Sequence, residues 1–301
     1  MEIRNIRTFI KAAELGSFSK AGLELGYAQS TVTLQMQQLE EELGVSLFDR
    51  QGKKLSLSQN GRTFLLHAYQ LINCERSARQ ALSPAASPAG QLRIGMVESL
   101  SVSAYADIFQ KYMKAFPDVT LIVKIATTLE LMALLEKGSL DVILLLDRKI
   151  VHDDWLVPLE KPETIIFFCD PHHPLAQKTV HLSEIAHEKF LLVEKGCNYR
   201  QVFEDRLAEQ RLLASCCLEI GSTHMIIDYV KARLGISLLP AFCLETELQQ
   251  QTIAQIFIKD CPLCLYAQII YNKHRGLTPA LQAFLDLSKP YFTSTCPPEP
   301  N

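Results

Sequence analysis

The sequence predicts a winged helix-turn-helix domain, all-α apart from a small β wing, then a long linker helix and a two-lobed α/β domain. Three observations predict this order. Residues 17–43 have the pattern of a helical hairpin. A proline- and alanine-rich break follows at residues 83–90, and beyond it strand and helix patterns alternate. The 301 residues, of which 48% are hydrophobic, are enough to fill the cores of two domains.

The hairpin motif, at about residues 18–37, turns at Gly26, because glycine adopts the left-handed conformation that ends a helix. Ser17 can cap the first helix, and the second is expected to begin near Gln29. Its apolar stripe consists of Val32, Met36, Leu39 and Leu43. An ordinary amphipathic hairpin would show the same stripe, but the outer face is small and polar, which suits reading of base edges. The residues predicted to contact DNA here are Ser17, Gln29, Ser30, Thr31, Thr33, Leu34 and Gln37.

A wing and a long helix are predicted after the hairpin. Residues 51–54 form a turn before the alternating strand 55–57, and the DNA-binding domain is expected to span residues 1–58. The basic residues that are placed to attract DNA phosphates are Arg50, Lys53 and Lys54. A helix over 59–82 is predicted to pair with the same helix of a second subunit, the alternative being packing against its own chain. Its seam consists of Phe64, Ala68, Leu71, Ala78 and Leu82.

Composition and motif content limit the classes of protein to which this chain can belong. The formal net charge is −3, so charge alone does not indicate DNA binding. The nine cysteines are scattered, and Cys261-Pro262-Leu263-Cys264 has no second ligand pair, so free thiols and no metal site are expected. Neither a signal peptide nor a membrane-spanning run is recognisable, so we expect a cytoplasmic protein without a membrane partner. No catalytic motif is found, so we expect no enzyme and no catalytic residue, although a cytosolic small-molecule-binding protein or enzyme is the rival class.

The region after the hinge at 83–90 is expected to form the two-lobed domain over residues 91–292. Strands at 92–97, 119–125 and 142–146 alternate with helices, which predicts a mainly parallel sheet. Lobe I is assigned to about 91–160 and 266–292, lobe II to about 161–265, and residues 293–301 to a tail. A cleft between two such lobes is a usual place for a small ligand.

These residues resemble the LysR-type transcriptional regulators over nearly the whole chain. The N-terminal signature is carried by Phe9, Gly16-Ser17-Phe18-Ser19, Ala21, Leu25, Gln29-Ser30, Val32-Thr33, Leu39-Glu40, Leu43-Gly44, Leu47-Phe48 and Arg50. Later landmarks are Leu92-Arg93-Ile94-Gly95, Leu140-Asp141, His173-Pro174-Leu175-Ala176 and Leu234-Gly235-Ile236. The resemblance implies an effector domain like the periplasmic solute-binding proteins. It also implies a homodimer or homotetramer on an interrupted palindrome of double-stranded DNA, with RNA polymerase as a further partner and a small-molecule co-inducer.

The chain departs from the family at three positions. Ala28 stands where a capping Ser is usual, Leu34 where Arg is frequent, and Arg233 where a small Gly is common. An exposed Leu cannot bind guanine through two hydrogen bonds, but it can contact a thymine methyl group. We therefore expect Leu34 to favour thymine at one half-site position.

The resemblance further implies effector contacts from four strand-to-helix loops. They are Ser99, Leu100, Ser101, Thr127, Thr128, Cys197, Asn198, Arg200, Thr223 and His224. Helix N-termini at such loops favour an anion, so a small carboxylate-type effector and no other cofactor is expected. The alternative is redox sensing through Cys197, whose pKa Lys195 and Arg200 could lower, although no partner cysteine lies close downstream before Cys216.

Overall fold

The computed structural model describes residues 1–51, 54–81 and 88–293 of the chain. It divides into two compact units, which are described separately. The N-terminal unit comprises Met1–Ala86, Leu134–Ser139 and His274–Thr278, and the C-terminal unit comprises Ser87–Ala133, Leu140–Lys273 and Pro279–Asn301. Most of the predicted hinge, and all of the predicted tail except residue 293, lie outside the described residues.

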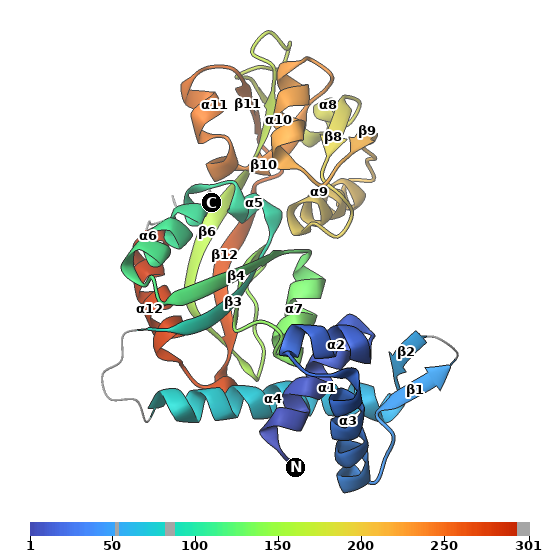
Figure 1. Ribbon diagram of the computed structural model, residues 1–301. Helices are drawn as coiled ribbons and strands as arrows, with labels where there is room; N and C mark the ends of the chain where they lie inside the picture. Colours follow the sequence, from blue (N-terminus) through green and yellow to red (C-terminus); the bar gives the residue numbers. More distant parts are fainter. Residues whose placement is uncertain (52–53, 82–87, 294–301) are drawn as a thin grey trace. The chain divides into compact units, whose positions relative to one another are not determined.

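The N-terminal unit is a winged helix-turn-helix (Figure 1). Its elements are α1 (Ile3–Leu15), α2 (Phe18–Leu25), α3 (Gln29–Leu43), β1 (Phe48–Gln51), β2 (Lys54–Leu57) and α4 (Gln59–Ala81). Phe9 is fully buried at the centre, with its ring 5.4 Å from that of Phe48 and 5.1 Å from that of Phe64. Aromatic rings from α1, the wing and α4 therefore share one small core.

The predicted hairpin is observed with its expected caps. The Ser17 side chain accepts a hydrogen bond from the backbone N–H of Lys20 at 3.3 Å, and Gly26 has φ of 71° where α2 ends. The recognition helix α3 begins at Gln29, but Ala28 at its N-cap offers no side-chain hydrogen bond. Local sequence signals therefore located this motif correctly, including the missing cap.

The linker helix α4 is partly covered by its own chain. Phe64 and Ala68, the first two members of the predicted pairing seam, belong to the core that α1 also fills. Arg7 on α1 forms a 2.8 Å ion pair with Glu75 on α4. The alternative, packing against its own chain, therefore describes the first half of α4, because α1 presents an apolar face to it. Leu71 is exposed, and Leu82 lies outside the described residues.

The C-terminal unit is organised by an eight-stranded mixed sheet in the order β4-β3-β5-β12-β6-β11-β7, with β10 paired to β6. Its strands are β3 (Gly90–Met96), β4 (Val119–Ile125), β5 (Val142–Asp147), β6 (Trp155–Cys169), β7 (Thr179–Val180), β10 (Ser237–Pro240), β11 (Ala254–Ile258) and β12 (Leu263–Asn272). The strands β3, β4 and β5 are parallel, as predicted. Beyond them the sheet is mixed and not mainly parallel, because β10, β11 and β12 run antiparallel to β6 while β7 runs parallel to β11.

The two lobes are joined by long strands that serve both of them. The first part of β6 pairs with β12 in lobe I, and its last residues, from Ile165 on, pair with β10 in lobe II. A separate parallel pair, β8 (Lys189–Leu192) with β9 (Ser215–Glu219), completes lobe II. The helices are α5 (Glu98–Ser101), α6 (Asp107–Ala115), α7 (Thr128–Lys137), α8 (Leu182–Ile185), α9 (Asn198–Glu209), α10 (Thr223–Lys231), α11 (Glu245–Gln249) and α12 (Pro279–Ser288).

Candidate functional site

The outer face of α3 is the first candidate site. Ser30, Thr31, Leu34 and Gln37 are exposed, and Leu34 has 54% of its surface accessible. The opposite stripe of Val32, Met36 and Leu39 is buried, so packing holds the exposed face in a fixed rotation. A helix that buries one side in this way can place the other in a major groove.

Hydrogen bonds constrain two of the predicted contact residues. The Ser19 hydroxyl donates to the Gln29 side-chain oxygen at 2.9 Å, which leaves the amide N–H groups of Gln29 free to donate. The Thr33 hydroxyl donates to the Gln29 backbone carbonyl at 3.0 Å, and Thr33 is half-buried. Thr33 is therefore less available for a base contact than its neighbours on α3.

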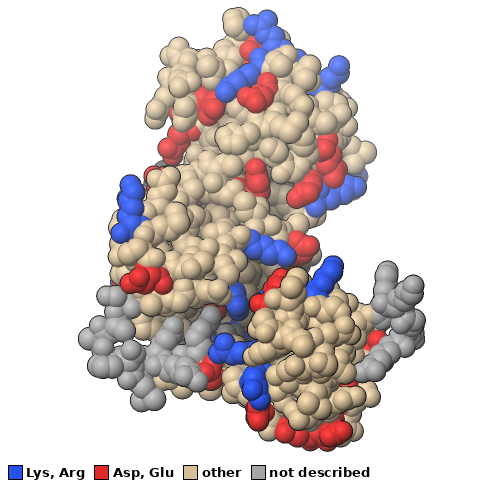
Figure 2. Space-filling model, viewed as in Figure 1, with Lys and Arg blue, Asp and Glu red and all other residues tan. Residues whose placement is uncertain are grey.

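Charge limits which end of α3 can approach DNA. Figure 2 shows acidic side chains gathered over the C-terminal end of α3, where Glu40, Glu41 and Glu42 lie. The Glu40 carboxylate accepts hydrogen bonds from the backbone N–H groups of Leu47, at 2.6 Å, and Phe48, so it anchors the start of the wing. Phosphates repel this end, and the N-terminal half of α3 is left as the reading surface.

The wing itself is observed as the antiparallel pair β1–β2. Arg50 and Lys54 lie in these strands, in register with Leu55 and Gln51 respectively, and their side chains are not described. Lys53 lies outside the described residues. Their predicted phosphate contacts stay predictions.

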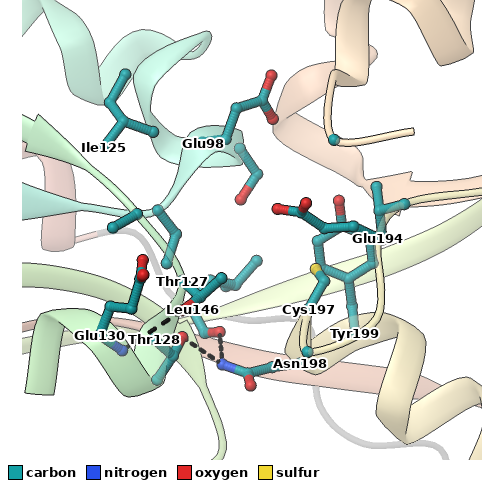
Figure 3. A pocket seen from close by; sticks show the side chains of 16 residues that line it. Glu98, Ile125, Thr127, Thr128, Glu130, Leu146, Glu194, Cys197, Asn198 and Tyr199 are labelled. Carbon is teal, nitrogen blue, oxygen red and sulfur yellow. Dashed lines mark hydrogen bonds between the residues drawn. The ribbon is translucent and has the colours of Figure 1, made fainter. Parts of the chain in front are cut away.

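The second candidate site is a cavity of about 410 Å³ between the two lobes, hereafter the effector cavity (Figure 3). It lies at the carboxyl ends of β3, β4, β5 and β8, and the loops after β3, β4 and β8 lead into helices. Its walls are Val97, Glu98, Ser99, Ile125, Ala126, Thr127, Thr128, Glu130, Leu146, Val193, Glu194, Gly196, Cys197, Asn198, Tyr199 and Gly221. This volume matches the range of small-molecule sites.

Half of the predicted effector residues line the effector cavity, namely Ser99, Thr127, Thr128, Cys197 and Asn198. The other half do not. Leu100 is buried in the core, the Ser101 hydroxyl donates to the Glu98 carbonyl at 2.7 Å, and the His224 side chain is exposed elsewhere. Sequence reasoning missed the two carboxylates Glu130 and Glu194. Their position could have indicated them, since Glu130 follows β4 and Glu194 follows β8 by five residues or fewer.

Two sets of hydrogen bonds join the lobes across the cavity. The Asn198 side-chain amide donates to the Thr128 hydroxyl and to the Leu146 carbonyl, each at 2.9 Å. The Glu98 carboxylate accepts from the backbone N–H of Thr223 at 3.1 Å and from its hydroxyl at 3.0 Å. Thr223, predicted to touch the effector, joins the lobes through these bonds and is not among the residues that line the cavity. A ligand that changes the distance between the walls must act on these bonds.

Arg200, another predicted effector contact, is a structural residue in this arrangement. It is only 4% exposed. Its guanidinium pairs with Glu204 at 2.7 Å and Glu219 at 2.8 Å and donates to the Val193 carbonyl at 2.6 Å. These contacts fasten α9 to β8 and β9. Arg200 does not line the effector cavity, although its partner Val193 does.

Cys197 does not have the environment of a reactive thiol. Burial raises its pKa to about 11, and hydrogen bonds from Tyr199 and the Arg200 backbone lower it only in part. The expectation that Lys195 and Arg200 lower this pKa was wrong, because the Arg200 guanidinium is paired with two carboxylates. Only the thiolate is an efficient nucleophile, so this burial disfavours redox chemistry at neutral pH.

Alkylation kinetics should show the effect of that burial. At pH 8, Cys197 in the folded protein is expected to react with iodoacetamide about 100-fold more slowly than in the urea-unfolded chain, because two pKa units separate the two states. Its rate should rise with pH until about 11. Mass spectrometry of each cysteine measures the rates, with the exposed Cys216 as the internal control. Oxidation of Cys197 by peroxide as fast as that of Cys216 would contradict the expectation.

An exposed recognition helix and a ligand-sized cavity on one chain define a DNA-binding protein with a small-molecule-binding domain. The chain matches two family descriptions, "Bacterial regulatory helix-turn-helix protein, lysR family" over residues 3–62 and "LysR substrate binding domain" over residues 85–293. It belongs to the LysR family of DNA-binding transcriptional regulators. No helix in the described part of the chain is long and apolar enough to cross a membrane.

Two bacterial relatives each match 97% of the chain. It is 33% identical to the HTH-type transcriptional regulator YwqM of Bacillus subtilis, over 97% of this chain and 100% of that protein. It is 30% identical to GltR of the same organism, over 97% of each chain. In fold it is similar to full-length OxyR from Pseudomonas aeruginosa (TM-score 0.75, 20% identity, 96% and 94% coverage). It is also similar to CbnR solved with its target DNA (TM-score 0.64, 20% identity, 96% and 99% coverage).

Proposed function

We propose that this protein is a homodimer or homotetramer that binds an interrupted palindrome and regulates transcription when a co-inducer occupies the effector cavity. The observation that carries the proposal is the cavity itself, across which reversible hydrogen bonds such as Asn198–Thr128 join the two lobes. A ligand with different affinities for two lobe arrangements shifts their populations. The protein would act in the cytoplasm, where its DNA lies, with RNA polymerase as the responding partner and without catalysing a reaction itself.

Exposed apolar surface supports the assembly. The strand β4 lies at one end of the sheet order, and its Ile122 and Val123 side chains are exposed. On α4, Leu71 is exposed at the part of the seam that α1 does not cover. Apolar residues on an outer strand favour pairing with another chain. We therefore propose contacts between subunits at both places.

Two helix N-termini support a co-inducer that carries a carboxylate. Thr128 and Asn198 are the first residues of α7 and α9, and both line the effector cavity. The positive end of a helix and its free N–H groups attract a negative group. Two such ends on opposite lobes would hold a carboxylate as the lobes close.

Base preference tests the DNA-reading part of the proposal. Genomic fragments bound by the wild-type protein would be used to define a duplex, and every half-site base pair would be substituted in turn. Leu34→Arg is expected to replace a thymine preference at one position by a guanine preference, worth about 1–3 kcal/mol. Fluorescence anisotropy over a salt series measures the affinities, which should fall steeply with salt.

The matched control is Leu23→Arg on α2, where the side chain is 84% exposed but lies off the outer face of α3. It adds the same charge and should raise affinity for all duplexes alike. An unchanged base preference in Leu34→Arg would refute the assigned contact. Failure of the wild-type protein to bind any genomic duplex at low salt would refute the proposed function as a whole.

A further inference from the structure

The charged side chains that line the effector cavity are all acidic. Glu98, Glu130 and Glu194 line it, and the described residues of its wall include no Lys, Arg or His. Its other two titratable groups are uncharged at neutral pH, because burial raises the pKa of Cys197 to about 11 and that of Tyr199 well above its usual value. A ligand in this cavity is therefore surrounded by net negative charge.

The three carboxylates are not equivalent. Glu98 is already engaged, since it accepts two hydrogen bonds from Thr223. Glu130 and Glu194 are exposed, and in the described part of the chain neither carboxylate forms a hydrogen bond or an ion pair. The Glu194 carboxylate lies against Gly221, where an added Cβ would be 3.1 Å from one of its oxygens. Two carboxylates are thus left to receive donors from a ligand.

These two carboxylates belong to different lobes. Glu130 lies in the first turn of α7 in lobe I, and Glu194 follows β8 in lobe II. In Figure 3 their side chains extend from opposite sides of the cavity. The buried guanidinium of Arg200 is already paired with Glu204 and Glu219. A ligand that carries only negative charge would be repelled by a carboxylate on each wall.

We propose that the co-inducer carries a protonated amine that lies between Glu130 and Glu194. This inference rests on the proposed function, in which a carboxylate faces the N-termini of α7 and α9. Together they specify a zwitterion of the amino-acid class. One ammonium group can donate to both carboxylates, so its binding draws Glu130 of lobe I and Glu194 of lobe II together. The same contact that gives specificity thereby favours the closed lobe arrangement.

Calorimetry on the full-length protein tests the charge requirement. The panel consists of the common amino acids, norvaline and 5-aminopentanoate, with pentanoate and butylamine as analogues that lack the amine or the carboxylate. At least one zwitterion is expected to bind, and its analogue without the amine should bind at least about tenfold more weakly. Glu130→Gln and Glu194→Gln should each weaken the zwitterion about tenfold, whereas Glu136→Gln, elsewhere on α7, should change it less than about twofold. Because all three glutamates are exposed, the variants are expected to keep the wild-type circular dichroism spectrum and melting temperature.

Two results would overturn the inference. One is that no amine-bearing compound of the panel binds at millimolar concentration, or that pentanoate binds as tightly as the zwitterions. The other is that both glutamine variants keep wild-type affinity for the zwitterion. Anisotropy with the genomic duplex, on the same samples, separates this failure from failure of the proposed function. If the protein binds its duplex and responds to pentanoate, the proposed function stands and the requirement for an amine is refuted. If it binds no duplex, the proposed function itself is refuted.

Discussion

Phe9→Ala is expected to unfold the winged helix-turn-helix and abolish DNA binding while the effector domain stays folded. Phe9 is fully buried, and its ring contacts those of Phe48 on the wing and Phe64 on α4. Removing such a ring leaves a cavity and costs about 3–5 kcal/mol. That loss is comparable to the whole stability of a small domain. No other side chain in the described residues joins α1, the wing and the linker helix through aromatic contacts.

Hydrogen exchange of the full-length variant measures this effect locally. Protection should be lost over α1–α4, whereas the urea midpoint reported by Trp155, the single tryptophan, should not move because it lies on β6. Leu23→Ala is the control, since an exposed side chain on α2 should change stability by less than about 0.5 kcal/mol. Retained protection and duplex binding in Phe9→Ala would show that this core does not depend on that ring.

Arg200→Met is expected to lower the free energy of unfolding of the effector domain by about 2–4 kcal/mol. Methionine keeps much of the side-chain volume but removes the guanidinium that donates to the Val193 carbonyl and pairs with two carboxylates. The Val193 residue is buried, so water cannot fully replace the lost hydrogen bond. Urea titration followed through Trp155 fluorescence measures the change. Arg206→Met, on the same helix but in an exposed pair with Glu209, should cost less than about 1 kcal/mol.

The loss of stability in Arg200→Met should also depend on pH. A hydrogen bond from Arg200 is the largest cause that lowers the pKa of Glu219 from its ordinary value of 4.5. A carboxyl whose pKa is lowered in the folded state stabilises the fold above 4.5, and this stabilisation is lost as the pH falls through the folded value. The difference between wild type and Arg200→Met should therefore shrink as the pH falls below 4.5. A difference that grows in acid would contradict the assigned pairing.

Local patterns predicted the N-terminal motif well because its signals act over one or two helical turns. The cap at Ser17, the left-handed Gly26 and the stripe from Val32 to Leu39 each depend on neighbours close in sequence. The same holds for β4, whose predicted and observed bounds are identical. The resemblance to the LysR family then identified five of the effector-cavity residues by position.

Side-chain direction and strand pairing were less predictable, because they depend on residues far apart in the chain. Arg200 looked like a ligand contact by its place in a loop, yet its partners include Glu219, which folding brings beside α9. The pairing of β6 with strands from both lobes could not be read from its own residues. Periodicity shows which face of an element is apolar, but not which distant element covers it.

The sequence by itself determined the family, the recognition helix and the order of the domains, since these follow from periodicity, caps and short motifs. Only the tertiary structure decided that Phe64 and Ala68 are covered by their own chain and that Arg200 is structural. It also decided that Glu130 and Glu194 line one cavity from different lobes. The physical reason is that the residue type alone gives a side chain its charge, whereas its partners depend on tertiary packing between residues far apart in the chain.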